Sequence, residues 1–175
     1  MRKGLIHVYT GDGKGKTTAA LGLILRASGY GMRTILVQFL KGRDTGEILA
    51  LENLSSVTVL RYTKDFGFYK YTSEQDRAEM VRQNNENLAE AYRLVTKGVC
   101  DLLVLDEICA AYNNGALDTA LADNLILNKP FGLELVLTGR NAPPHFMEAA
   151  DYITEFINRK HPYDSGISAR EGIEF

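Results

Sequence analysis

The chain is 175 residues long, about the length of one domain, so we expect residues 1–175 to fold as a single domain. Hydrophobic residues make up 45% of it and charged residues 24%, while 20 basic and 22 acidic side chains leave a net charge of −2. This balance is typical of a globular protein and argues against nucleic-acid or membrane-surface partners.

Cys100 and Cys109 are the only cysteines in the sequence, and neither stands in a Cys-x-x-Cys pair. With three scattered histidines they cannot supply the four clustered ligands of a structural zinc site. The first residues form no apolar signal segment, and no apolar run approaches the roughly 18 residues of a membrane-spanning helix. We therefore expect a cytoplasmic protein without a membrane partner.

Short β-rich runs alternate with helical segments along the chain. We expect strands over residues 5–10, 34–39, 57–62, 102–105, 133–137 and 152–156, and helices over 17–28 and 73–97. The first helix is apolar on nearly every face, which predicts that both of its sides are covered. The alternation predicts a three-layer α/β fold, in which a mostly parallel sheet carries helices on both faces. Such a sheet binds ligands at the carboxyl ends of its strands.

A glycine-rich segment follows the first predicted strand and opens the first helix, and it reads TGDGKGKTT over residues 10–18. Its glycines let successive N–H groups point inward, and the helix N-terminus adds partial positive charge. Lys16 supplies a full charge to phosphates, and the Thr17 hydroxyl is placed to bind Mg²⁺ or Mn²⁺. The segment departs from the usual phosphate loop only at Thr10, where a glycine is common. It predicts a P-loop NTPase-like (RecA-like) fold that binds the phosphates of a nucleotide through Gly11, Asp12, Gly13, Lys14, Gly15, Lys16, Thr17 and Thr18.

A second motif is the apolar run 102–105, which ends in Asp106 and Glu107. In phosphate-loop proteins a strand of this kind lies beside the loop, and its acid holds the metal ion directly or through water. We therefore expect Thr17, Glu107 and Asp106 to form the metal side of the site. A solvated acidic turn is the alternative interpretation.

The phosphate loop alone does not decide the chemistry. A GTPase would carry Asn-Lys-x-Asp, and the segment beginning Asn128-Lys129 lacks the aspartate. Residues 64–72 lack the arginines of a kinase lid and instead carry four aromatic rings, which predict either a loop pinned to the core or a wall for a large flat ligand. A small-molecule kinase and a nucleotide-binding ATPase module are alternatives at this point.

Several segments match one family in order and spacing. They read GDGKGKTTAA (11–20), VQFLKG (37–42), GE (46–47), GF (67–68), LDE (105–107), LTGRNAP (137–143), ADYITE (150–155), KHPYDSGI (160–167) and REGIE (170–174). With them the chain resembles the ATP:cob(I)alamin (corrinoid) adenosyltransferases of the phosphate-loop type. The resemblance implies that a Co(I) corrinoid attacks the 5′ carbon of ATP and that triphosphate leaves, in adenosylcobalamin biosynthesis or salvage.

The resemblance also assigns roles at the ATP end of the site. It implies catalytic roles for Lys16, Thr17 and Glu107, and an additional phosphate contact for Arg26. It further implies a homodimer and a reduced flavoprotein as electron donor. Longer family members carry an N-terminal extension that helps to cover the corrinoid, so we expect a more open site here.

At the corrinoid end the resemblance implies a mobile loop whose rings press on the lower face of the corrinoid. Phe68 matches the first of these rings. The family often has Trp two residues later, whereas this chain has Lys70 there, so either Tyr71 supplies the second ring one residue further on or the site is built differently. His161 and Tyr163 in the tail are interpreted either as a structural hook or as direct contacts to adenosine or corrinoid.

Overall fold

One parallel sheet organises the structure, a computed structural model that describes residues 3–43, 45–66 and 72–174. The sheet has six strands in the order β3-β2-β4-β5-β1-β6, and every neighbouring pair is parallel. The strands are β1 (Ile6–Thr10), β2 (Thr34–Gln38), β3 (Val57–Leu60), β4 (Leu102–Asp106), β5 (Glu134–Thr138) and β6 (Tyr152–Glu155). Each predicted strand is confirmed, with ends that differ by at most two residues.

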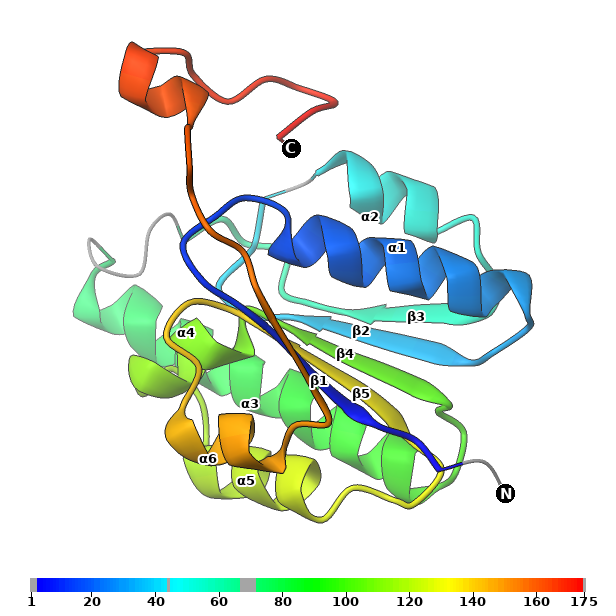
Figure 1. The fold of residues 1–175 in the computed structure, drawn as a ribbon. Helices are drawn as coiled ribbons and strands as arrows, with labels where there is room; N and C mark the ends of the chain where they lie inside the picture. Colours follow the sequence, from blue (N-terminus) through cyan, green and yellow to red (C-terminus); the bar gives the residue numbers. More distant parts are fainter. Residues whose placement is uncertain (1–2, 44, 67–71, 175) are drawn as a thin grey trace.

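Helices cover both faces of the sheet, as predicted for a three-layer α/β fold (Figure 1). One face carries α1 (Lys16–Gly29) and α2 (Gly46–Leu51), and the other carries α3 (Glu74–Thr96), α4 (Ile108–Asn113), α5 (Thr119–Leu127) and α6 (Pro144–Ala149). Only α1 and α3 were predicted from the sequence. The other helices are six to nine residues long, too short for an apolar period to stand out.

The core forms two apolar clusters, one on each face of the sheet. Strands β2, β4 and β5 lie inside the sheet and are buried on both faces, which explains their continuous apolar sequence. The long helix α3 begins where the sequence predicts, because the Ser73 side chain accepts a hydrogen bond from the backbone N–H of Asp76 (3.1 Å).

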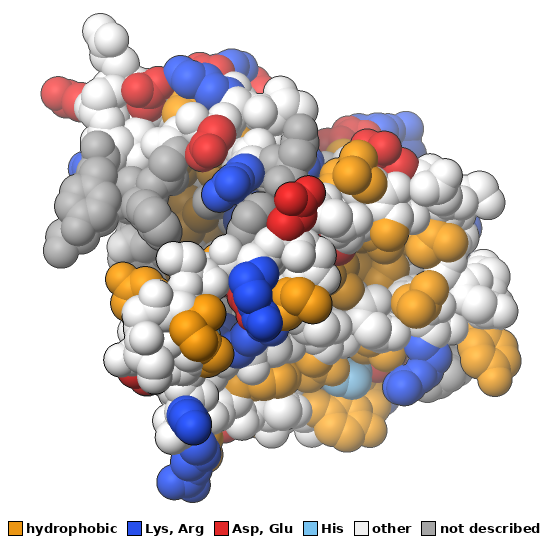
Figure 2. Space-filling view, turned by 90° about the horizontal axis from the view of Figure 1, so that it is seen from above, with side chains coloured by type: hydrophobic (Ala, Val, Ile, Leu, Met, Phe, Trp, Pro, Cys, Tyr) orange, Lys and Arg blue, Asp and Glu red, His pale blue; other side chains and the backbone are white. Residues whose placement is uncertain are grey.

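The prediction that α1 is covered on both sides is wrong. Its buried residues are Ala20, Ile24 and Ala27, which form one stripe against the sheet, whereas Leu25 is 64% exposed. Figure 2 looks onto the side of the molecule that carries α1 and α2 and shows hydrophobic side chains at its surface. In a three-layer fold a helix has the sheet on one side only, so the outer apolar residues of α1 stay exposed in this chain.

No described helix combines the length and the apolar character that crossing a membrane requires.

The single buried stripe of α1 predicts unequal effects for two neighbouring truncations. Ile24→Ala should lower the free energy of unfolding by about 2–5 kcal/mol, because it opens a cavity against the sheet. Leu25→Ala should change it by no more than about 0.5 kcal/mol, because that side chain is exposed. Urea denaturation followed by circular dichroism measures both values, and equal losses would contradict the one-sided packing.

Candidate active site

A cavity of about 710 Å³ opens at the carboxyl ends of the strands, where a parallel sheet is expected to bind its ligand. Its wall comes from distant parts of the chain. The lining residues are Asp12, Gly13, Lys14, Gly15, Lys16, Thr17, Thr18, Leu21, Lys41, Gly46, Glu47, Glu107, Ala110, Arg140, Gly172, Ile173 and Glu174. The glycine-rich loop and the start of α1 therefore form one side of this cavity, and the loops after β2, β4 and β5 face them.

The backbone of the loop has the shape that its glycines predict. Gly11 (φ 99°) and Gly15 (φ 115°) both adopt the left-handed region that glycine tolerates best. Gly15 precedes α1 and offers no side-chain cap, so the first N–H groups of the helix have no capping side chain and can bind an anion.

The loop also packs tightly against the segment that follows β6. The backbone N–H of Gly13 donates to the carbonyl oxygen of Phe156 (2.6 Å), and that of Phe156 donates to Thr10 (2.8 Å). A Cβ atom on Gly13 would lie 2.8 Å from the carbonyl carbon of Phe156. Gly13 is thus required by this close backbone contact.

Lys16 already lies inside the loop. Its ammonium group donates to the carbonyl oxygens of Gly11 (2.6 Å) and Gly13 (2.8 Å). Burial lowers the pKa of Lys16, and the positive charge of Arg140 lowers it further. The side chain is therefore a cation held where the phosphates of a bound nucleotide would lie.

Asp106 is completely buried and forms the centre of the metal side of the site. Its Oδ1 accepts hydrogen bonds from the hydroxyls of Thr17 (2.9 Å) and Thr138 (2.7 Å). Its Oδ2 accepts one from the ammonium group of Lys41 (2.7 Å) and a longer one from Gln38 (3.4 Å). The predicted pair Thr17 and Asp106 is thus brought together over 89 residues of sequence.

Glu107 follows Asp106 and lines the cavity. Its backbone is left-handed (φ 61°), which is unusual for a residue other than glycine, and its N–H donates to the hydroxyl of Thr138 (2.9 Å). Burial raises the pKa of its carboxyl group, and the charge of Asp106 adds to the increase, while Lys41 and Lys16 oppose it.

The oxygen atoms of Thr17, Asp106 and Glu107 suit a metal ion whose remaining ligands come from the phosphates of a nucleotide. Among the described residues no three His, Cys, Asp or Glu side chains gather as a metal cluster. A hydroxyl with one or two nearby carboxylates is the usual protein share of a Mg²⁺ site that depends on nucleotide phosphates. Thr17, Asp106 and Glu107 provide this donor set.

Two further groups at the cavity were not among the predicted site residues. Lys41 contacts both Asp106 and Thr17, and Arg140 lines the cavity and forms an ion pair with Asp12 (3.7 Å). Both belong to segments that carry the family resemblance, VQFLKG and LTGRNAP, but nothing in a single sequence says which residue of such a segment points inward.

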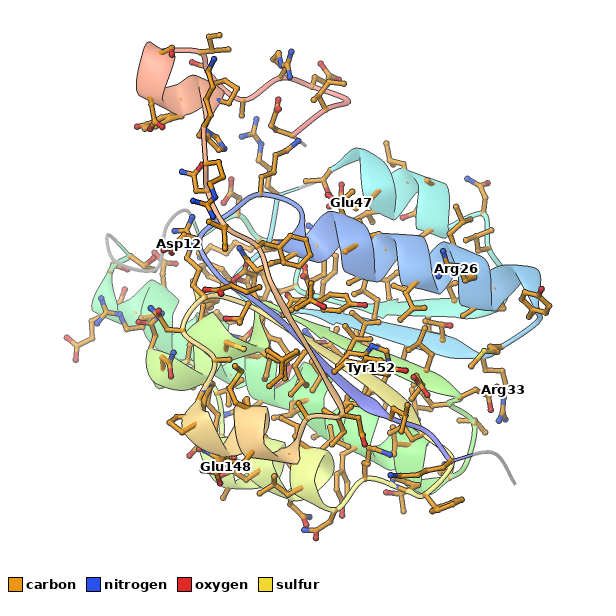
Figure 3. The ribbon with its side chains drawn as sticks, viewed as in Figure 1. Asp12, Arg26, Arg33, Glu47, Glu148 and Tyr152 are labelled. Atoms are coloured by element: carbon orange, nitrogen blue, oxygen red, sulfur yellow. The ribbon has the colours of Figure 1, made fainter. Side chains whose placement is uncertain are left out.

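Arg26, for which a phosphate contact was predicted, lies away from this cavity. Arg26 lies in the last turn of α1 and does not line the cavity. Ten residues separate it from Lys16, which is about 15 Å along a helix. Figure 3 shows Arg26 toward the far end of α1, while Asp12 and Glu47 lie at the loop end.

The tail meets the cavity through residues other than the predicted pair. His161 and Tyr163 lie at a 3-10 turn (Pro162–Ser165), where His161 Nδ1 accepts from the N–H of Tyr163 (3.2 Å), and neither residue lines the cavity. The chain then turns back over the loop (Figure 1), and Glu174 lies 3.6 Å from Lys14. Phe68 and Tyr71 lie outside the described residues.

The tight contact at Gly13 predicts a loss of nucleotide binding on adding one methyl group. Gly13→Ala should weaken ATP binding by about tenfold or more, because the new Cβ atom forces the loop away from Phe156. Gly22→Ala is the matched control, since no atom lies within 4 Å of a Cβ at that position of α1. Isothermal titration calorimetry with ATP gives both affinities, and an equal effect at the two positions would contradict the packing argument.

Glu107→Gln tests the burial of the Glu107 carboxyl group. Because its pKa in the folded protein lies above the ordinary value of 4.5, the wild type loses stability relative to the variant as pH rises through that raised pKa. We expect the variant to be the more stable protein near neutral pH and the two to be equal at about pH 4 or below. Urea titrations of the nucleotide-free protein over this range measure the difference, and a difference independent of pH would argue against the raised pKa.

Among solved structures, a KaiC-like protein of Pyrococcus horikoshii OT3 has a similar fold. The TM-score is 0.55 at 16% sequence identity, and the match covers 92% of this chain and 76% of the other. This likeness concerns the fold alone, and it agrees with the predicted P-loop NTPase-like (RecA-like) architecture.

Comparisons of sequence give a more specific result. A corrinoid adenosyltransferase of Sinorhizobium sp is 40% identical over 175 residues, covering 99% of this chain and 81% of that protein. A corrinoid adenosyltransferase of Pseudomonas aeruginosa is 37% identical, with 99% and 84% covered. The family model described as ATP:corrinoid adenosyltransferase BtuR/CobO/CobP matches residues 2–175. The chain therefore belongs to the ATP:corrinoid adenosyltransferase family.

Proposed function

We propose that this protein is a corrinoid adenosyltransferase, which transfers the 5′-deoxyadenosyl group of ATP to a Co(I) corrinoid and releases triphosphate. One observation carries the proposal beyond family membership: six segments that bear the resemblance line one cavity. They are the glycine-rich loop, Lys41 after β2, Gly46 and Glu47 at the start of α2, Glu107 after β4, Arg140 after β5 and the tail at residues 172–174. The product serves adenosylcobalamin biosynthesis or salvage.

The reaction is a displacement at carbon. Co(I) donates its electron pair to the 5′ carbon of ATP, a Co–C bond forms, and the C–O bond to the triphosphate breaks, so that the oxygen leaves with its electron pair. No protein nucleophile is needed, because the cobalt is the nucleophile. The protein's contribution is to bind and orient the two substrates and to stabilise negative charge on the leaving triphosphate.

The residues of the cradle fit this contribution. We assign triphosphate binding to the loop amides of residues 11–18 and to the ammonium group of Lys16, which the loop carbonyls hold at 2.6 and 2.8 Å. Thr17, with Asp106 and Glu107 beside it, would hold Mg²⁺ or Mn²⁺. When bound, such an ion adds positive charge next to the phosphate oxygens.

The corrinoid side of the proposal rests on the family. We propose Phe68 and Tyr71 as the rings on the lower face of the corrinoid, a reduced flavoprotein as electron donor, and the cytoplasm as the place of action. We also propose a single domain that forms a homodimer. In support, all described strands belong to one sheet, and the edge strand β6 and the residues after it expose Tyr152, Ile153 and Ile157 by half or more.

The leaving group tests the proposed reaction. With ATP, a divalent metal and chemically reduced cobalamin under anaerobic conditions, we expect inorganic triphosphate and a light-sensitive adenosylated corrinoid in equal amounts. Lys16→Met should lower kcat/KM by about 100-fold or more, because it removes a fixed charge at the leaving group. Lys97→Met, an exposed lysine at the end of α3, is the control and should leave the rate unchanged. Formation of ADP without a cobalt–carbon bond would overturn the proposal.

A further inference from the structure

The ammonium group of Lys41 lies where a metal ion would be expected. It is 2.7 Å from Asp106 Oδ2 and 3.1 Å from Thr17 Oγ1, and it donates to both. Thr17 and Asp106 are the hydroxyl and carboxylate that a Mg²⁺ site of this fold employs. A lysine and a divalent ion cannot both occupy this point, because like charges at such a distance repel each other.

The backbone around Lys41 is built to direct its side chain into the cavity. Leu40 is left-handed (φ 57°), an uncommon conformation for a branched apolar residue, and it turns the chain immediately after β2. Gly42 then lies so close to Lys64 that a Cβ atom would be 1.9 Å from the Lys64 carbonyl oxygen. The position of Lys41 is therefore fixed on both sides by its neighbours in sequence.

Asp106 gives a physical reason for a cation at this point. Its carboxylate has no exposed surface, and a buried negative charge is costly unless it is paired and hydrogen-bonded. Lys41 is the cation that pairs with it, and 31% of the Lys41 side chain is exposed, on the cavity side. The ammonium group is thus held by Asp106 and has open space beside it to move into.

We propose that Lys41 holds the place of the metal ion in the nucleotide-free protein and transfers to the triphosphate when the metal–ATP complex binds. In the free protein Lys41 satisfies Asp106, so the metal binds only weakly without ATP. When metal and ATP arrive together, the ion takes over Thr17 and Asp106, and the released ammonium group becomes a further cation at the leaving group. This inference rests on the proposed use of a metal–ATP complex at this site.

Binding of Mn²⁺ to the nucleotide-free protein tests the first half. Free Mn²⁺ is measured by electron paramagnetic resonance, with the full chain and no ATP or corrinoid. Lys41→Met should bind Mn²⁺ about tenfold or more tightly than the wild type, because the competing charge is gone. Lys97→Met is the control for loss of a lysine elsewhere and should behave as the wild type. Unchanged Mn²⁺ affinity in Lys41→Met would overturn the place-holding role.

Binding of inorganic triphosphate with Mg²⁺ tests the second half. Lys41→Met by itself already tightens metal binding, so the quantity compared is the gain in metal affinity that triphosphate produces. That gain should be about tenfold smaller in Lys41→Met than in the wild type, whereas Lys41→Arg, which keeps the charge, should retain most of it. Equal gains in Lys41→Met and the wild type would overturn the transfer to the phosphates. If circular dichroism shows that Lys41→Met is unfolded, Lys41→Gln replaces it in both assays. Glutamine also removes the charge, but its amide can still donate a hydrogen bond to the buried carboxylate. Neither assay contains a corrinoid, so their failure is distinct from failure of the proposed reaction.

Discussion

The buried carboxylate of Asp106 is the interaction on which the arrangement of this site depends. It accepts hydrogen bonds from Thr17 at the start of α1 and from Thr138 at the end of β5, and Lys41 pairs with it from the loop after β2. Strand order makes this possible, because β2 and β5 are the two neighbours of β4. A buried charge without such partners would be strongly destabilising, so the carboxylate and its donors hold the carboxyl ends of three strands and the amino end of the first helix together.

The phosphate loop depends on a second constraint, the backbone that follows β6. Gly11 and Gly13 both face Phe156 so closely that a side chain on either would collide with it. The edge strand β6 therefore shapes the loop, although about 140 residues of sequence separate them. The same segment leads into the tail, which returns to the cavity at residues 172–174. The chain from Phe156 to Glu174 thus packs against the glycine-rich loop at its beginning and lines part of the cavity at its end.

The charges of the cavity explain how a protein with a net charge of −2 can bind a polyanion. Lys16, Lys41 and Arg140 come from three different elements and converge on the same space, while Asp12, Glu107 and Glu174 lie among them. Lys16 is held by carbonyl groups of the loop, so this cation is positioned before any ligand arrives, whereas Lys41 is held by the carboxylate of Asp106. Such preorganisation favours stabilisation of charge that develops during a reaction, since little reorganisation is needed at that moment.

The six strands, the two long helices, the phosphate loop and the pair of acids could be predicted from the amino-acid sequence, because each is a local pattern of apolar period, glycine spacing or capping. The resemblance to the family could also be recognised from the sequence, since each matching segment is a contiguous run of residues. The helices of six to nine residues could not be predicted, because they are held by packing on the sheet and are too short for a period.

Which charged residues meet at the cavity became visible only in the folded chain. Arg26 follows the loop closely in sequence, yet the rise of α1 carries it away from the cavity, whereas Lys41 and Arg140 are distant in sequence and line it. Likewise the apolar character of α1 did not reveal that one side of it faces solvent. The reason is the same in each case: a sequence pattern fixes the local conformation, while the order of strands and the direction of each helix fix which side chains share a space.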